Sequence, residues 1–294
     1  MSIPKEVSAL ITLALSEDLG KTTADSFNIL GDVTSLAFIP AESTSNATLL
    51  ARQSLTLSGL EVAIECFHRI DPTLSIIPHA KEGDEVKTAQ ALLTIHGSTR
   101  SILSAERTAL NFLGRLCGIA TLSSRYAEAV QGTHVKLLDT RKTTPGWRLL
   151  EKQAVKAGGC VNHRMGLHDA VLVKDNHLAS LGDLSLLSPV IQRIKREHPG
   201  LEIEIEADTL EQVEQLLYLS GIDVILLDNM SCELMHKAVA LRNEKAPGVL
   251  LEASGGVTLE SVPEIARTGV DRISVGALTH SAVNADLSLE IEPG

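Results

Sequence analysis

The hydrophobic and polar positions along the chain follow two patterns, and the change from one to the other lies near Thr133. Before Thr133 the spacing is mixed, with helical periodicity in some stretches and short strand-like runs in others. We expect helices over the first 20 residues, Leu60–Ile70 and Ser101–Val130, and strands over Ala47–Ala51, Leu74–Ile77 and Leu92–Ile95.

After Thr133, short apolar runs alternate with amphipathic helical stretches. The predicted strands are Val135–Leu138, Ala170–Val173, Ile203–Ile205, Val224–Leu227, Val249–Leu251 and Ile273–Val275. The predicted helices are Leu149–Ala157, Leu184–Arg196, Leu210–Leu219, Cys232–Lys245 and Leu259–Thr268. Strands separated by helices of this length indicate a parallel sheet. We favour a closed or nearly closed α/β barrel over an open doubly wound sheet.

Polar residues or glycines follow every one of these predicted strands. They are Asp139–Lys142, Lys174–His177, Glu206–Asp208, Asp228–Asn229, Glu252–Gly256 and Gly276–Ala277. In a barrel of parallel strands the carboxyl ends meet at one rim, where such folds carry their chemistry. The pattern therefore predicts one site built from several strand ends.

Composition and charge narrow the class of protein. Of 294 residues, 44% are hydrophobic and 21% charged, which is typical of a globular chain and excludes overall disorder. The formal net charge is −11, so sequence-independent DNA binding is not expected. The apolar runs are too short to span a membrane, and the N-terminus lacks the layout of a signal peptide. The four cysteines form no CxxC pair, which favours reduced thiols in a cytoplasmic protein.

Residues 139–177 are locally cationic within this acidic chain, with seven Lys and Arg against four Asp and Glu. Arg141, Lys142 and Lys174 directly follow strands, so they are candidates to bind a small polyanion. The other cations in the first helix of this stretch have helical spacing, which predicts a solvated helix face: Arg148, Lys152 and Lys156.

Two further features favour an anion site in the same stretch. Thr144 and Pro145 have the order of a helix cap and a first helical residue, and helix N-termini attract anions. His163 is followed by Arg164 just before a predicted strand, and this neighbour favours a functional histidine over a structural one.

Carboxylates and glycines suggest how a metal ion and a phosphate would be held. Glu202, Glu204 and Glu206 alternate with isoleucines, so a strand places them on one face, where they need cationic partners or a metal. Glu206 and Asp228 end neighbouring strands and are candidate Mg²⁺ ligands. The last two strands end in turns suited to phosphate, namely Ser254-Gly255-Gly256 and Val275-Gly276-Ala277.

Three longer motifs stand out, namely Leu138–Gly146, Asn162–Leu167 and Val173–His177. Further segments accompany them in order along nearly the whole chain, namely Ala105–Phe112, Glu206–Asp208, Leu227–Met230, Glu252–Gly256 and Ser274–His280. Together these segments resemble the quinolinate phosphoribosyltransferase family.

The resemblance implies an α/β fold with an N-terminal α/β sandwich domain, residues 1–130 including a long connecting helix, and a C-terminal incomplete, TIM-like barrel, residues 131–294. It leaves open that the chain end returns to the first domain. It implies decarboxylating transfer of a phosphoribosyl group from phosphoribosyl pyrophosphate to quinolinate, with Mg²⁺ as cofactor. The products are nicotinate mononucleotide, CO₂ and pyrophosphate, a step of NAD synthesis. It also implies a homodimer with shared active sites, a hexamer remaining possible.

The resemblance further implies roles for individual residues. Arg107 would enter the site of the neighbouring subunit, while Arg141, His163 and Arg164 would meet the carboxylates of quinolinate. The full set implied to bind substrates or Mg²⁺ is Thr140, Arg141, Lys142, His163, Arg164, Lys174, Glu206 and Asp228. The set implied to hold the 5-phosphate is Ser254, Gly255, Gly256, Val275, Gly276 and Ala277.

One segment departs from the family pattern, and other functions remain open. Lys21–Leu30 separates Gly20 from Gly31, an insertion of about nine residues that we expect to lengthen a loop at little entropic cost. The alternatives are a related enzyme that uses another pyridine or base, of the kind linked to molybdate transport, a Schiff-base lyase that uses Lys174, and a non-catalytic metabolite-binding dimer.

Overall fold

A computed structural model describes residues 3–20, 31–182 and 186–293. The insertion expected at residues 21–30 lies outside the described residues. The chain divides into two compact units, the first made of residues 1–124, 144–159 and 282–294 and the second of residues 125–143 and 160–281. The domain boundary after residue 130 stays a prediction. Among the described residues, no helix combines the length and apolar character needed to cross a membrane.

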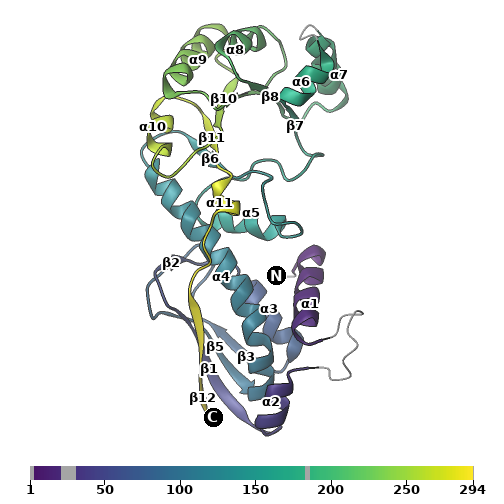
Figure 1. The fold of residues 1–294 in the computed structure, drawn as a ribbon, viewed down its shortest axis with the longest axis vertical. Coiled ribbons are helices and arrows are strands. Elements are labelled where there is room, and N and C mark those ends of the chain that lie inside the picture. Colours follow the sequence, from purple (N-terminus) through teal and green to yellow (C-terminus); the bar gives the residue numbers. More distant parts are fainter. Residues whose placement is uncertain (1–2, 21–30, 183–185, 294) are drawn as a thin grey trace. The chain divides into compact units, whose positions relative to one another are not determined.

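The first unit contains a four-stranded antiparallel sheet in the order β12-β1-β5-β3 (Figure 1). Its strands are β1 (Thr44–Ala51), β3 (Ser75–Pro78), β5 (Ala91–Ser98) and β12 (Leu287–Pro293), and a separate pair is formed by β2 (Leu55–Thr56) and β4 (Glu85–Val86). Ala47 on β1 is fully buried and pairs with Ile95 on one side and Ile291 on the other. The last strand of the chain therefore completes the first sheet.

Five helices belong wholly or largely to the first unit, namely α1 (Lys5–Asp18), α2 (Val33–Phe38), α3 (Leu60–Ile70), α4 (Thr99–Ala129) and α5 (Arg148–Ala157). The predicted N-terminal helix is confirmed, and its residues Val7, Ile11 and Leu15 are buried. The bounds of α3 are those predicted, and its Phe67 is fully buried, as is Phe112 of α4. Phe112 also stacks on Trp147, with ring centroids 4.6 Å apart.

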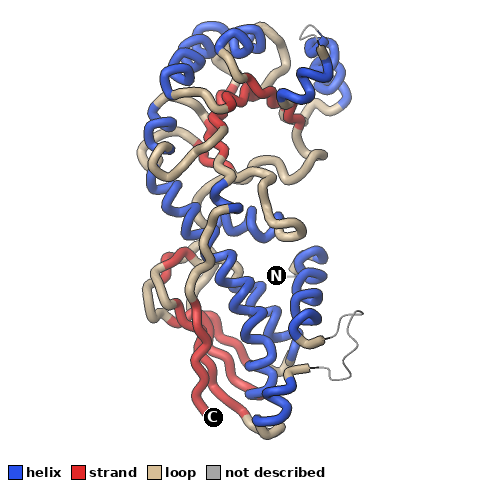
Figure 2. The backbone as a smooth tube through the Cα atoms, in the orientation of Figure 1, coloured by secondary structure: helices blue, strands red, loops and turns tan. Residues whose placement is uncertain are grey.

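The second unit is built on a six-stranded parallel sheet in the order β6-β11-β10-β9-β8-β7. The strands are β6 (Lys136–Leu138), β7 (Val171–Val173), β8 (Ile203–Ala207), β9 (Val224–Asp228), β10 (Leu250–Ser254) and β11 (Arg272–Ser274). The sheet curves into an arc with helices outside it (Figure 2). Over the described residues β6 and β7 end the sheet without pairing with each other, so the barrel is incomplete, as predicted.

The helices of the second unit are α6 (Asp175–Leu181), α7 (Leu187–Glu197), α8 (Leu210–Leu217), α9 (Cys232–Lys245), α10 (Val262–Arg267) and α11 (Ala277–His280). The bounds of α9 agree with the sequence prediction, and α8 packs beside it. The residues expected to begin the helix at Leu184 fall partly outside the described residues, and α7 begins at Leu187.

Two predictions for the segment around α5 are wrong. The helix begins at Arg148, since Gly146 has a φ of +82° and lies with Pro145 in a preceding turn. Lys152 has an exposed fraction of 1%, so it does not belong to a solvated face. The buried side of α5 is broad, because Leu150, Glu151, Ala154 and Val155 are buried as well.

Candidate active site

A cavity of about 650 Å³ lies in the second unit and is lined mainly by residues that end or follow the strands of the parallel sheet. The residues predicted for the site that line this cavity are Thr140, Arg141, Lys142, His163, Arg164, Lys174, Glu206, Asp228, Ser254, Gly255 and Gly256. Two further lining residues, Asp175 and Asn229, lie in the strand-end segments that were predicted but were given no role there. The prediction missed Leu172, Leu226 and Ser274. Separate strand ends thus converge on a common cavity.

Other predicted residues lie elsewhere. Arg107 is exposed on α4, in the first unit. Val275 is buried, and neither it nor Gly276 and Ala277 lines the cavity. A Cβ atom on Gly276 would lie 3.1 Å from Cδ of Lys142, so this glycine leaves room for the lysine stem. Gly276 therefore contributes to the cavity through Lys142.

Asp139, at the carboxyl end of β6, fastens the two cationic segments of the site. Its side chain is fully buried and accepts the backbone N–H of His163 at 2.8 Å and the side-chain amide of Asn162 at 2.7 Å. A buried carboxylate that accepts two such bonds holds its donors firmly. Asp139 thereby ties the loop after β6 to the residues that precede β7.

The loop that carries Arg141 and Lys142 is held through its backbone. The N–H of Lys142 donates to Oγ1 of Thr140 at 3.0 Å, and its carbonyl oxygen accepts from Oγ1 of Thr279 at 2.8 Å. Both cationic side chains remain exposed. The backbone is therefore fixed while both side chains are exposed at the cavity.

The cations of the cavity repel one another. Burial, together with the neighbouring positive charge of Arg141, lowers the pKa of Arg164. Arg164 is also bonded through Nη1 to the carbonyl oxygen of Ala170 at 3.1 Å, which restricts its side chain. Two guanidinium groups at one cavity create a positive potential that favours an anionic ligand.

Each of the three alternating glutamates has a cationic or imidazole partner. Glu202 binds Arg272 through two contacts of 2.9 and 2.7 Å, and Glu206 binds Nζ of Lys174 at 3.2 Å. The carboxylate of Glu204 lies 3.1 Å from Nε2 of His163. The prediction that these carboxylates need partners is confirmed.

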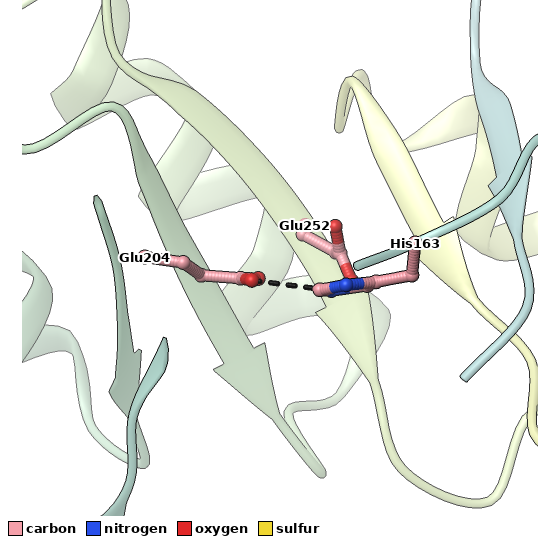
Figure 3. A group of neighbouring side chains, drawn as sticks. All are labelled: His163, Glu204 and Glu252. Atoms are coloured by element: carbon pink, nitrogen blue, oxygen red, sulfur yellow. Dashed lines mark ion pairs between the residues drawn. The ribbon is translucent and has the colours of Figure 1, made fainter. Parts of the chain in front are cut away.

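His163 lies against two buried carboxylates from the strands on either side of β9, Glu204 on β8 and Glu252 on β10, which are 1% and 0% exposed (Figure 3). The second carboxylate lies 3.3 Å from Nε2. Burial alone would lower the pKa of His163, but the contacts with the two carboxylates raise it to about 10. Burial also raises the pKa of Glu204.

The other ring nitrogen of His163 points to the backbone. Nδ1 accepts the N–H of Arg164 at 2.7 Å, which requires an unprotonated Nδ1 and places the ring proton on Nε2. This bond opposes the imidazolium form that the carboxylates favour, and because the geometry is direct we assign the Nε2–H form. A metal ion at Nε2 would need the lone pair there and a proton on Nδ1, so this group does not suit a metal.

A second acidic group is better suited to a metal ion. Carboxylate oxygens of Glu206, Asp208 and Asp228 lie within 4.8 Å of one another at the ends of β8 and β9. Oxygen donors of this kind suit Mg²⁺, which commonly takes one or two carboxylates together with substrate phosphates. Asp208 was not predicted as a site residue, although it stands two residues after Glu206 in the sequence.

The glycine turn after β10 is required by its surroundings. Gly255 has a φ of +96°, and a Cβ there would lie 2.1 Å from Oδ1 of Asn229. The backbone N–H of Asn229 donates to the carbonyl oxygen of Ser254 at 2.9 Å, which brings the two turns together. Gly255 thus lies too close to Asn229 to carry a side chain, and Gly256 has free space beside it. Because neither glycine has a side chain, the backbone of this turn forms part of the cavity wall.

Comparison with known proteins agrees with this arrangement. The model of the quinolinate phosphoribosyl transferase C-terminal domain matches residues 119–290, and that of the N-terminal domain matches residues 32–117. The chain is 38% identical over 262 residues to the nicotinate-nucleotide pyrophosphorylase [carboxylating] of Mycobacterium leprae, covering 88% of this chain and 91% of that protein. It is 39% identical over 299 residues to the chloroplastic protein of that name from Arabidopsis thaliana, covering 98% and 83%.

A solved structure extends the likeness to the whole fold. The nicotinate-nucleotide pyrophosphorylase of Ehrlichia chaffeensis matches with a TM-score of 0.88 and 38% identity, over 99% of this chain and 100% of that one. The two domain models together span most of the chain. The chain therefore belongs to the quinolinate phosphoribosyl transferase family.

Proposed function

We propose that this protein transfers a phosphoribosyl group from phosphoribosyl pyrophosphate to the ring nitrogen of quinolinate, with loss of CO₂. The products are nicotinate mononucleotide, CO₂ and pyrophosphate, as in the synthesis of NAD. The observation that carries the proposal is the close set of cations, Arg141, Lys142, Arg164 and Lys174, around one cavity in an acidic protein. Family membership supports the same reaction.

In this proposal the main work of the protein is to bring two anions together. Quinolinate carries two carboxylates and the donor carries several phosphate charges, so the two substrates repel each other in water. The guanidinium groups of Arg141 and Arg164 bind the carboxylates, since a planar fork of donors matches a carboxylate. Holding both reactants in reacting geometry supplies several kcal/mol of the rate enhancement, on the order of that in intramolecular reactions.

Glu206, Asp208 and Asp228 would hold Mg²⁺, because their oxygens already lie close together. When bound, Mg²⁺ neutralises charge on the pyrophosphate as it leaves. The backbone at Ser254–Gly256 would receive the 5-phosphate of the sugar, and Lys142 and Lys174 lie at the same cavity to meet the remaining anionic groups. Nζ of Lys174 lies 3.2 Å from the carboxylate of Glu206, and this ion pair argues against a Schiff-base role for the lysine.

The bond changes follow from these contacts. The ring nitrogen attacks the anomeric carbon while pyrophosphate departs, and the cationic sugar that develops is stabilised by the nearby carboxylates of Glu206 and Asp228. The nitrogen then carries a positive charge, and the ring accepts the electron pair when the adjacent carboxylate leaves as CO₂. A proton replaces that carboxylate on the ring. No covalent enzyme intermediate is needed.

The proposal includes a homodimer in which Arg107 of each subunit enters the partner's site. Arg107 is exposed on α4 and supports this role as a cation available to a neighbour. We further propose a cytoplasmic location, which suits a protein whose four cysteines are free thiols.

The reaction is tested with the purified protein, quinolinate, phosphoribosyl pyrophosphate and Mg²⁺, and nicotinate mononucleotide is measured by chromatography. Nicotinate replaces quinolinate in the control, and we expect no comparable turnover because one of the two carboxylates is missing. Equal turnover of nicotinate or of another pyridine would instead support the related enzymes that use a different acceptor.

A further inference from the structure

The ring of His163 has no nitrogen left to bind a substrate in this arrangement. Nδ1 accepts the N–H of Arg164, and Nε2 faces Glu204 at 3.1 Å and Glu252 at 3.3 Å. Figure 3 shows both carboxylates pointing at the ring, and they come from β8 and β10, the strands on either side of β9. The ring therefore acts on the site through what it holds in place.

The segment that His163 anchors carries a cation of the site. Arg164 is the next residue, and both it and His163 line the 650 Å³ cavity and also a smaller one of about 240 Å³. The smaller cavity includes Lys136 and Arg272, the first residues of β6 and β11. His163 thus forms part of a wall inside the sheet, with Arg164 beside it.

The two carboxylates lack other partners that would explain their burial. Over the described residues, one oxygen of Glu204 and both oxygens of Glu252 form no hydrogen bond, while the nearby Glu202 is fully engaged with Arg272. Burying a carboxylate without partners is costly, so its retention calls for a role. The only group that both carboxylates approach among the ion pairs of the described residues is Nε2 of His163.

We propose that Glu204 and Glu252 are positioning residues, which hold His163 at Nε2 and thereby place Arg164 for a carboxylate of the substrate. Asp139 holds the same segment by its backbone and by Asn162, so the carboxylate pair adds the orientation of the ring. This inference rests on the proposed function for the identity of the substrate. Its structural part, the state of the His163 ring, does not depend on that function.

The test compares two substitutions at Glu204 and at Glu252: glutamine, which conserves the shape and keeps a hydrogen-bond acceptor, and leucine, which removes the acceptor. Glu204→Leu removes the acceptor that lies 3.1 Å from Nε2, and Glu252→Leu removes the second carboxylate, at 3.3 Å. In each variant we expect the KM for quinolinate to rise about tenfold or more, or about 1.4 kcal/mol. The KM for phosphoribosyl pyrophosphate should change by less than about threefold, because different groups bind the donor. Glu204→Gln and Glu252→Gln keep an acceptor and should restore the KM for quinolinate to within about threefold.

The matched control is Glu202→Gln, which removes a carboxylate of the same segment that pairs with Arg272 and not with His163. It should leave the KM for quinolinate unchanged. Leucine variants with wild-type KM, or glutamine variants as damaged as the leucine variants, would overturn the inference. Thermal unfolding of each variant identifies those that fold, and if neither leucine variant folds, the NMR signal of His163 in the wild type decides the inference.

A second readout needs no turnover. Protein labelled with ¹⁵N-histidine should show a proton held on Nε2 of His163 at pH 7.5, assigned by loss of the signal in His163→Gln. In the leucine variants the proton should no longer be held on Nε2, and the ring should exchange between its two neutral tautomers. A wild-type ring that already exchanges freely between forms would contradict the positioning role. Absence of turnover in the wild type would contradict the proposed function and leave the NMR result to decide this inference.

Discussion

Single buried residues determine where the charged groups of the site lie. Asp139 is fully buried and accepts two hydrogen bonds from the Asn162–His163 backbone and side chain. Thr279 fixes the carbonyl oxygen of Lys142. Cations on flexible stems lose considerable rotamer entropy when they bind, so fixing their backbone in advance reduces what binding must overcome.

Loss of a site cation should abolish catalysis without unfolding the protein. We expect Arg141→Ala and Lys174→Ala each to lower kcat/KM by a factor of about 10³ or more, because both cations oppose the charge of the substrates. Both side chains are exposed, so circular dichroism and the thermal midpoint should stay near those of the wild type.

The matched control is Arg193→Ala, which removes one exposed positive charge from α7, outside the cavity. Its rate should be normal. Near-normal rates for both Arg141→Ala and Lys174→Ala would contradict the site.

Two adjacent glycines should respond differently to the same substitution. Gly255→Ala places a Cβ 2.1 Å from Oδ1 of Asn229 at a φ of +96°, whereas Gly256→Ala meets no atom within 4 Å at a φ of +58°. We expect Gly255→Ala to lower the free energy of unfolding by about 1–3 kcal/mol and to raise the KM for phosphoribosyl pyrophosphate. Gly256→Ala should be milder on both measures, in urea unfolding and in steady-state kinetics. If Gly255→Ala and Gly256→Ala changed the free energy of unfolding and the KM equally, close contact with Asn229 would not be what requires glycine at position 255.

Helices and strands with a strong hydrophobic periodicity were predicted well. Elements whose position depends on residues far away in the sequence were not. The bounds of α3 and α9 agree with the apolar spacing, because their own sequence decides which side is buried. Strand β12 was not predicted, although Leu287, Leu289 and Ile291 alternate with polar residues, since its partner β1 lies far away in the sequence. The charge of Lys152 predicts a surface position, yet the packing around α5 buries this residue.

The pairing of β12 with β1 should contribute measurably to stability. Removing residues 286–294 uncovers an edge of β1 that pairs from Ser45 to Ala51. We expect the thermal midpoint to fall by roughly 5–10 °C, the size of a loss of a few kcal/mol in a protein of this length. A full-length variant with valine at positions 287, 289 and 291 keeps the alternation and should unfold near the wild-type temperature. An unchanged midpoint in the shortened protein would contradict the contribution.

At the scale of the whole molecule, the sequence located the rim of the site but not its interior. Strand ends can be read from short apolar runs followed by polar residues, and the parallel sheet brings them together. The contact of Glu252 with His163 depends on strand order, because β10 and β8 reach the ring from either side of β9. A glutamate inside the apolar run Leu250–Ala253 was the available signal.

The proposed exchange of Arg107 between subunits predicts complementation. Arg107→Ala and Lys174→Ala are each expected to be inactive, but mixed dimers would contain one site with both residues intact. Random exchange of subunits at equal amounts should therefore restore about a quarter of wild-type activity, since half of the dimers are mixed and each has one complete site. Native mass spectrometry verifies the exchange. Verified mixed dimers without activity would contradict a shared site.

The central claim is that one cavity joins an anionic pyridine to an anionic sugar donor and then releases one carboxylate. It is tested most directly by incubating the purified protein with phosphoribosyl pyrophosphate, Mg²⁺ and quinolinate that carries ¹³C in the carboxylate next to the ring nitrogen. The account predicts one labelled CO₂ for each pyrophosphate released. Pyrophosphate without labelled CO₂, or no dependence of CO₂ release on the sugar donor, would contradict it.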